Sequence, residues 1–136
     1  MAGRADLLSM SGEGTGASGQ RVLVVDDHPA VGNLVGVLLQ ADGHTAVIEH
    51  DGARALERLS EMSFDLVIVD VHLGAMDGVE FYRRLEQMTP QLAHRVIAMT
   101  GDAIAPAELM ERGLTTLSKP FPRECLQAAI RRALSA

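Results

Sequence analysis

The sequence predicts an α/β domain in which a parallel sheet of five strands is covered by helices on both faces. From residue 21 onward, five short apolar runs of strand length alternate with five segments whose apolar residues recur at helical spacing. This alternation is typical of parallel sheets. In addition, the run 64–70 has five apolar residues out of seven and ends in Asp70. A continuous apolar run of this length is typical of a strand buried on both faces.

The five expected strands cover 22–25, 44–49, 64–70, 95–99 and 115–118. The second is more polar than the others, so we expect it at an edge of the sheet. Because crossovers between parallel strands are right-handed, helices cover both faces only if the chain reverses direction once along the sheet. We expect the first and third strands to flank that reversal, in the strand order 2-1-3-4-5.

Residues that favour helix starts and stops lie between the strands. Pro29, Pro106 and Pro122 suit the first turn of a helix, Asp51 can cap another, and Gly43 suits a helix end. Two glycines inside the first helix weaken it by about 1 kcal/mol each relative to alanine, so packing must hold it in place. The apolar residues expected at helical spacing include Val31, Leu34, Val35, Leu38, Leu39, Phe81, Tyr82, Leu85, Met88, Leu109 and Met110.

Composition limits the classes of function. Residues 1–20 are predicted to be a flexible tail or linker because 11–20 is rich in glycine and serine, which leaves 21–136 as one domain. The net charge of −6 argues against direct binding of nucleic acid. No apolar run approaches the roughly 20 residues of a membrane span, and no secretory signal is present. We therefore expect a cytoplasmic domain, a monomer or a weak dimer, without membrane contact.

Polar residues follow four of the five expected strands. Asp26 and Asp27 follow the first, Asp70 ends the third, Thr100 follows the fourth and Lys119 follows the fifth. Because parallel strands bring their carboxyl ends to one edge of the sheet, we expect these side chains to meet there. Three neighbouring carboxylates repel one another, so one would stay protonated unless a cation joins them.

Oxygen donors at such a site suit Mg²⁺, which retains several waters and often bridges carboxylates to phosphate. We expect Asp27, Asp70 and the backbone carbonyl of His72 to bind it directly, and Asp26 to act through water. A carboxylate can be the nucleophile in phosphoryl transfer. Lys119 would then neutralise charge on the transferring oxygens and Thr100 would hydrogen-bond one of them. None of the histidines shows a spacing typical of metal ligands: His28, His44, His50 and His94.

The pattern resembles the receiver domain of two-component response regulators and hybrid histidine kinases. The matching stretches are VLVVDDHP (22–29), DLVIVDVHLGAMDGVE (65–80), VIAMTGD (96–102) and LSKPF (117–121). The resemblance implies a flavodoxin-like fold. It implies that Asp70 accepts phosphate, with Mg²⁺, from a phosphohistidine on a histidine kinase or histidine phosphotransfer domain. We expect a hybrid-kinase receiver or a single-domain regulator without an output domain, and the glycine- and serine-rich lead-in favours the hybrid-kinase receiver.

Two positions depart from the family pattern. Gly74 stands where the family usually has proline, so the loop is expected to be more mobile. Thr116 stands where the family usually has an aromatic residue that swings inward on activation, which fits a phosphate relay better than an output-coupled switch. The resemblance also implies that His72 and Asp102 influence the lifetime of the phosphate.

Two other functions remain open at this stage. A Mg²⁺-dependent phosphatase with an aspartyl-phosphate intermediate usually needs a second acid two residues after the nucleophile, and His72 occupies that position. A phosphate-independent interaction module on the same fold would have no use for the acids, Thr100 and Lys119. We therefore favour the phosphoacceptor.

Overall fold

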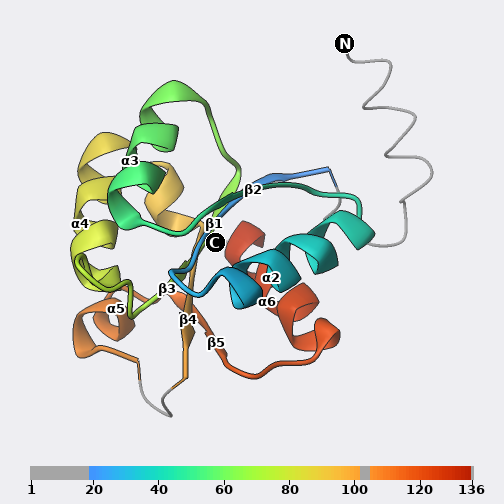
Figure 1. Ribbon diagram of the computed structural model, residues 1–136. Coiled ribbons are helices and arrows are strands. Elements are labelled where there is room, and N and C mark those ends of the chain that lie inside the picture. The colour runs from blue at the N-terminus through green and yellow to red at the C-terminus, as the bar shows by residue number, and fades with distance from the viewer. Residues whose placement is uncertain (1–18, 102–104, 136) are drawn as a thin grey trace.

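The computed structural model describes residues 19–101 and 105–135. In this part of the chain, five strands alternate with helices (Figure 1). The strands are β1 (Arg21–Val25), β2 (Thr45–Glu49), β3 (Leu66–Asp70), β4 (Val96–Thr100) and β5 (Thr115–Ser118). The helices are α2 (Pro29–Ala41), α3 (Gly52–Glu61), α4 (Gly78–Met88), α5 (Ala107–Glu111) and α6 (Arg123–Ser135), with a short 3₁₀ helix, η1 (Leu92–His94), before β4.

The sheet is parallel and has the order β2-β1-β3-β4-β5, which confirms the predicted fold. In the register of the central strands, Val25 lies opposite Val69, and Asp70 lies opposite Met99. At the far side, Thr100 lies opposite Ser118. The last residues of β3, β4 and β5 therefore reach the same edge of the sheet, next to the residues that follow β1.

Two apolar layers hold the helices against the sheet. Alternate residues of a strand point to opposite faces, so Leu23 and Val67 pack with α3, α4 and α5, while Val24 and Ile68 pack with α2 and α6. Figure 1 shows these two groups of helices on opposite sides of the strands. The four residues 66–69 of β3 are at most 1% exposed, as expected for a central strand with both faces covered.

Some apolar residues expected at helical spacing are exposed. In α2, Val35 and Leu39 are fully buried but Leu34 is 57% exposed. Met88 and Met110 are also exposed, at the last turns of α4 and α5. Each helix packs only one stripe against the sheet, and these three side chains lie outside that stripe.

The glycines of α2 allow this helix to approach β2 closely. A Cβ atom on Gly36 would lie 2.5 Å from Cδ1 of Ile48, and one on Gly32 would lie 3.3 Å from Cγ2 of the same side chain. Packing against β2 thus explains why a helix with two unfavourable glycines forms here.

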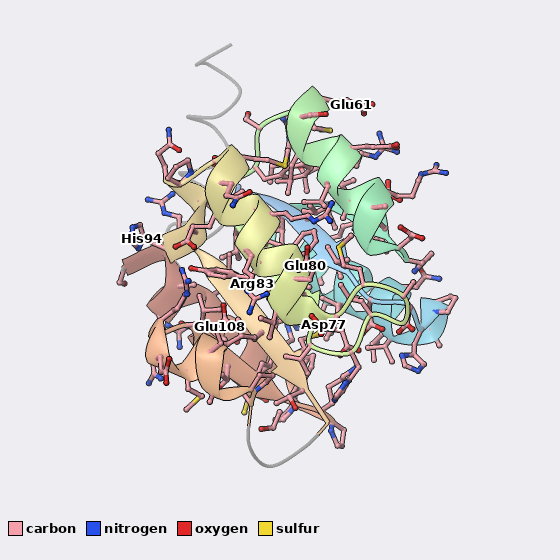
Figure 2. The ribbon with its side chains drawn as sticks, turned by 90° about the vertical axis from the view of Figure 1, so that its left-hand side faces the viewer. Glu61, Asp77, Glu80, Arg83, His94 and Glu108 are labelled. Atoms are coloured by element: carbon pink, nitrogen blue, oxygen red, sulfur yellow. The ribbon has the colours of Figure 1, made fainter. Side chains whose placement is uncertain are left out.

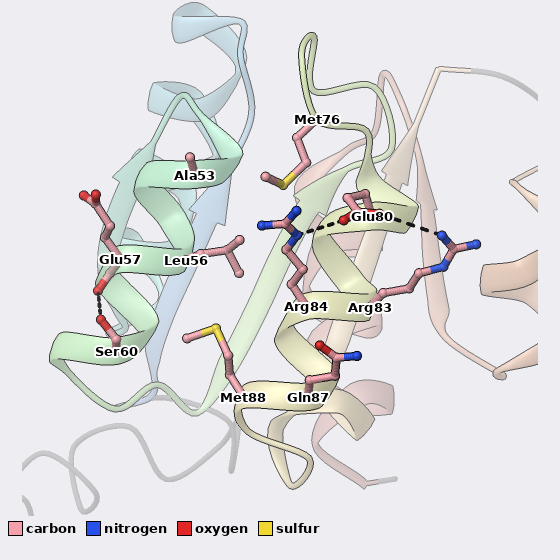
Figure 3. A pocket seen from close by; sticks show the side chains of 10 residues that line it. All are labelled: Ala53, Leu56, Glu57, Ser60, Met76, Glu80, Arg83, Arg84, Gln87 and Met88. Carbon is pink, nitrogen blue, oxygen red and sulfur yellow. Dashed lines mark hydrogen bonds and ion pairs between the residues drawn. The ribbon is translucent and has the colours of Figure 1, made fainter.

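The outer surface of α4 and α5 carries ion pairs (Figure 2). The guanidinium group of Arg83 lies 2.6 Å from a carboxylate oxygen of Glu108, and Arg112 pairs with Glu86. Both pairs are exposed, so solvent screens them and they contribute little to stability. Beside them, α3 and α4 enclose an open groove lined by Leu56, Met76 and Met88, with charged residues at its rim (Figure 3).

The start of α4 is tied to the end of β3. The backbone N–H of Gly78 donates to the carbonyl of Val71 at 2.9 Å. Asp77 caps the helix, since its carboxylate accepts from the N–H of Glu80 at 2.8 Å. A Cβ on Gly78 would lie 2.7 Å from Cα of Val71 and 2.9 Å from the carbonyl oxygen of Asp70. Only glycine fits this contact without a shift of the backbone.

We predict that Gly78→Ala lowers the free energy of unfolding by about 1–3 kcal/mol, because the added methyl group collides with backbone atoms that cannot rotate away. Urea unfolding followed by circular dichroism measures this. Gly101→Ala is the matched control, since a Cβ there meets nothing within 4 Å. Equal stability of the two variants would contradict the packing constraint at Gly78.

Stability is also expected to depend on pH through His44. Burial lowers the pKa of this side chain below 6.5, and the charge of Asp42 only partly offsets the effect. The imidazole Nδ1 accepts a hydrogen bond from the N–H of Gln20 at 3.2 Å, as the neutral ring allows. The unfolded chain therefore takes up a proton near pH 6.5 that the folded chain resists, so the free energy of unfolding falls as the pH drops below 6.5.

Chemical denaturation at several pH values between 5 and 8 tests this. His44→Asn keeps an acceptor for Gln20 but does not titrate, and we expect it to flatten the decline of stability on the acid side. An unchanged slope in His44→Asn would show that other groups cause the decline.

Candidate functional site

The carboxyl end of β1 supplies two carboxylates that differ in exposure. Asp26 is fully buried, and its Oδ1 accepts from the N–H of His28 at 2.8 Å. Its backbone N–H donates to the carbonyl of Glu49 at 3.1 Å, which continues the pairing between β1 and β2. The Asp27 side chain is 33% exposed and lies beside it. The turn between β1 and α2 thus fixes one acid by hydrogen bonds and leaves the next one at the surface.

Asp70 is the last residue of β3 and is only 2% exposed. Its Oδ1 accepts from the N–H of His72 at 2.9 Å, and its Oδ2 lies 2.6 Å from Nζ of Lys119. An isolated buried carboxylate would be costly. The lysine and the backbone N–H reduce that cost by bonding to the two oxygens of this carboxylate.

Lys119 joins two of the three acids. Its Nζ lies 2.6 Å from Asp70 and 3.3 Å from Oδ2 of Asp26. Burial alone would lower the pKa of Lys119, but the hydrogen bond to Asp70 and the charges of Asp70 and Asp26 outweigh it and raise the pKa above 10.5. The ammonium therefore stays charged at neutral pH. Its backbone is held in place because its N–H donates to the carbonyl of Thr100 at 2.8 Å.

The structure places the other predicted site residues as follows. Thr100 is buried at the end of β4, beside β5. His72 is exposed just after β3, and Thr116 is exposed on β5, opposite Ala98. Asp102 lies outside the described residues. The five residues that follow strand ends therefore gather at one edge, whereas Thr116 lies two residues back along β5.

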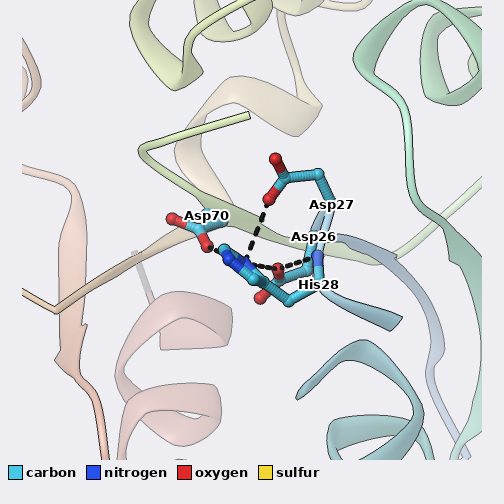
Figure 4. A group of neighbouring side chains, drawn as sticks. All are labelled: Asp26, Asp27, His28 and Asp70. Carbon is cyan, nitrogen blue, oxygen red and sulfur yellow. Dashed lines mark hydrogen bonds and ion pairs between the residues drawn. The ribbon is translucent and has the colours of Figure 1, made fainter. Parts of the chain in front are cut away.

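The residues of the acidic edge fit a divalent cation. Oδ1 of Asp27 is buried and accepts no hydrogen bond among the described residues, although Nδ1 of His28 lies 3.1 Å from it. Donor atoms of Asp26, Asp27, His28 and Asp70 all lie within 4.8 Å of one another (Figure 4). A buried carboxylate oxygen without a donor is unfavourable unless a cation satisfies it. We call these four residues the acidic cluster; it could bind a metal ion.

His28 was missed by the prediction, which gave it no role as a metal ligand. Its Nδ1 lies 3.1 Å from Asp27 Oδ1 and 3.2 Å from Asp26 Oδ1. The chain turns sharply from β1 into α2, so the residue after the two acids folds back over them. Its spacing from other histidines and acids in the sequence follows no metal-ligand motif. The one feature that could have indicated its role is its position directly after the Asp26-Asp27 pair.

The loop after β3 also borders the cluster. Gly74 has a φ of +75°, and a Cβ there would lie 3.3 Å from Oδ2 of Asp27. A positive φ is readily adopted by glycine and is not accessible to proline. The departure from the family proline therefore has a local structural reason: this loop takes a backbone conformation that proline cannot.

Comparisons with known proteins agree on one family. Residues 22–131 match the family model of the response regulator receiver domain. The chain is 34% identical over 108 residues to the signal transduction histidine-protein kinase BarA of Escherichia coli K12, covering 77% of this chain and 12% of BarA. It spans 26–44% of the length of several transcriptional regulatory proteins that it also matches.

Solved structures show the same likeness. The chemotaxis protein CheY4 of Vibrio cholerae superimposes with a TM-score of 0.76 at 30% identity, covering 86% of this chain and 100% of CheY4. The receiver domain of a sensor histidine kinase from Pseudomonas aeruginosa PAO1, with a magnesium ion coordinated in its active-site cleft, gives a TM-score of 0.75 at 25% identity, covering 88% of this chain and 100% of that domain.

The fold and the acidic edge define a signalling domain of the flavodoxin-like α/β class. The chain belongs to the response regulator receiver domain family of two-component systems. Among its described helices, none has both the length and the apolar character required to cross a membrane.

We predict that divalent cations stabilise the protein through Asp27. Asp27→Asn removes one of three clustered negative charges, so it should raise the free energy of unfolding without metal by on the order of 1 kcal/mol. It should also weaken the stabilisation that added Mg²⁺ gives to the wild type, since binding to the folded state raises stability in proportion to ln(1 + [L]/Kd).

Thermal unfolding with EDTA or with Mg²⁺ measures both effects. Asp77→Asn is the matched control, because it also removes one carboxylate, lies outside the acidic cluster and keeps a side chain suited to the helix cap. An Asp27→Asn variant that responds to Mg²⁺ as fully as the wild type would exclude Asp27 as a ligand.

Proposed function

We propose that Asp70 accepts a phosphoryl group from a phosphohistidine on a histidine kinase or a histidine phosphotransfer domain. The observation that carries this proposal is the Asp70 carboxylate, which is held at the sheet edge 2.6 Å from Lys119 and beside Asp26 and Asp27. A carboxylate oxygen attacks the phosphorus, and the new P–O bond forms as the P–N bond to the partner imidazole breaks. The resulting aspartyl phosphate is the signal.

We further propose that the site holds Mg²⁺, with Asp27, Asp70 and the His72 carbonyl as direct ligands and Asp26 acting through water. When bound, Mg²⁺ would neutralise charge on the phosphoryl oxygens. Lys119 is close enough to Asp70 to pair with the same group. Thr100, at the end of the neighbouring strand, would donate its hydroxyl to a phosphoryl oxygen.

The proposed organisation follows from the same family. Residues 21–136 would form the receiver domain and 1–20 a tail or linker. The domain would act in the cytoplasm as a hybrid-kinase receiver or a single-domain regulator, as a monomer or a weak dimer that binds neither nucleic acid nor membrane directly. Its partners would be proteins that carry a phosphorylatable histidine.

We propose that the domain passes phosphate on rather than switching through an aromatic side chain. Thr116 is exposed at the position of the usual ring, and it has no aromatic ring that could swing inward. The side chain of His72 is also exposed, at the mouth of the site, so it can act on the water that hydrolyses the phosphate. Together with Asp102, it is proposed to set the phosphate lifetime.

Reaction with a small phosphodonor tests the proposal. In the presence of Mg²⁺, acetyl phosphate should add one phosphoryl group to the wild type, detected by intact-protein mass spectrometry, and beryllofluoride should form a stable complex. Asp70→Asn should abolish both, because an amide is a far weaker nucleophile.

Asp65→Asn is the matched control, since Asp65 lies just before the amino end of the same strand and its Oδ2 accepts from the N–H of Arg21 at 2.8 Å, a bond that the asparagine oxygen can keep. We expect it to react like the wild type. No adduct on the wild type, or an undiminished adduct on Asp70→Asn, would overturn the proposal; steady turnover of a phosphomonoester would favour a phosphatase instead.

A further inference from the structure

The imidazole of His28 occupies a position among all three acids of the cluster. Its Nδ1 lies 3.1 Å from Asp27 Oδ1, 3.2 Å from Asp26 Oδ1 and 4.0 Å from Asp70 Oδ2. Figure 4 shows the ring reaching over the end of β1 toward Asp70. Although the side chain is 65% exposed, its Nδ1 is turned toward the acids, where it hydrogen-bonds Asp26 Oδ1 and lies at ion-pair distance from Asp27.

These separations match those between ligands of one metal ion. Two ligands at right angles around an ion, each about 2.1 Å from it, are about 3.0 Å apart, and two opposite ligands are about 4.2 Å apart. Nδ1 stands at such distances from three carboxylate oxygens. An ion bound by these oxygens would therefore have the imidazole nitrogen within its coordination shell after a small adjustment.

The backbone of His28 is fixed, whereas its exposed side chain is held only by the contacts of Nδ1 with the acids. Its N–H donates to Asp26 Oδ1 at 2.8 Å, and Pro29 follows in the first turn of α2. The side chain is 65% exposed, so a small rotation toward an ion breaks no packing. Asp26 thus holds His28 close to the other acids. The same carboxylate would belong, together with the His28 ring, to the metal site.

We propose that His28 is an additional ligand that shifts the metal preference of the phosphoacceptor site from Mg²⁺ toward first-row divalent ions that bind imidazole, such as Co²⁺, Ni²⁺ and Zn²⁺. Mg²⁺ takes oxygen ligands almost exclusively, so it gains little from the ring. Transition-metal ions bind imidazole well. The proposal rests on the proposed function only in placing the ion at the phosphoacceptor site.

Calorimetric titration of tag-free protein with Co²⁺ and, separately, with Mg²⁺ tests this at one fixed pH. We expect His28→Ala to weaken Co²⁺ binding roughly tenfold or more, as loss of a metal-supporting histidine typically does, and to leave Mg²⁺ binding within about twofold. His94→Ala is the matched control, because His94 is also exposed but lies in η1, before the amino end of β4 (Figure 2).

Unchanged Co²⁺ affinity in His28→Ala would overturn the proposal. A rise in affinity for both ions would also overturn it, because it would show that the ring obstructs the site. Nuclear magnetic resonance gives a direct readout: Co²⁺-loaded wild type and His94→Ala should show a strongly shifted, exchangeable imidazole N–H signal that His28→Ala lacks. Its presence in His28→Ala would assign the ligand to another histidine and overturn the proposal.

The two proposals can fail independently. Beryllofluoride binding with Mg²⁺ reports on Asp70 as the phosphoacceptor and does not need His28. A wild type that prefers Co²⁺ through His28 but forms no beryllofluoride complex supports the metal proposal and overturns the proposed function. If the wild type forms the beryllofluoride complex with Mg²⁺, and His28→Ala binds Co²⁺ as tightly as the wild type, the proposed function is supported and the metal proposal is overturned.

Discussion

The structure depends on keeping negative charges together at the edge of a buried sheet. Asp26 and Asp70 are almost completely buried, and Asp27 lies beside them. Their mutual repulsion opposes folding, and Lys119 offsets part of it from the neighbouring side of the sheet. The strand order makes this possible, because a parallel sheet with β1, β3, β4 and β5 side by side in that order brings these residues to one edge. The repulsion that remains opposes folding, and a cation that bound the acidic cluster would relieve it.

Backbone contacts make the site rigid where it faces the sheet. The backbone N–H of Lys119 donates to the carbonyl of Thr100. Gly78 packs against the carbonyl oxygen of Asp70 and the backbone of Val71. The side that faces solvent is formed by His28, His72 and Gly74, which are all exposed. The backbone N–H groups of the two histidines are bonded to Asp26 and Asp70. The acids and the lysine are therefore positioned before any ligand arrives.

Most of the fold was predictable because its signals are local. Buried strands such as 66–69 are continuous apolar runs, and the residue that ends each run marks the edge where the site forms. The prediction began β3 two residues early, at Phe64, and ended β4 one residue before Thr100. The helix η1 was not predicted, since three residues leave no periodic pattern. Met88 was wrongly expected on the inner face of its helix, because spacing alone does not say how wide a stripe the sheet covers.

The candidate site was predictable in its strand-end residues and less so in its turns. Parallel topology alone brings Asp26, Asp70, Thr100 and Lys119 together. The position of His28 depends on how one turn folds back, which no periodicity encodes. The conformation of Gly74 limits which residues this position accepts. Its φ of +75° excludes proline, whose ring fixes φ at a negative value. Any side chain there would also place a Cβ 3.3 Å from Oδ2 of Asp27. The backbone of this loop therefore selects the residue beside the acidic cluster, in addition to the chemistry of the cluster itself.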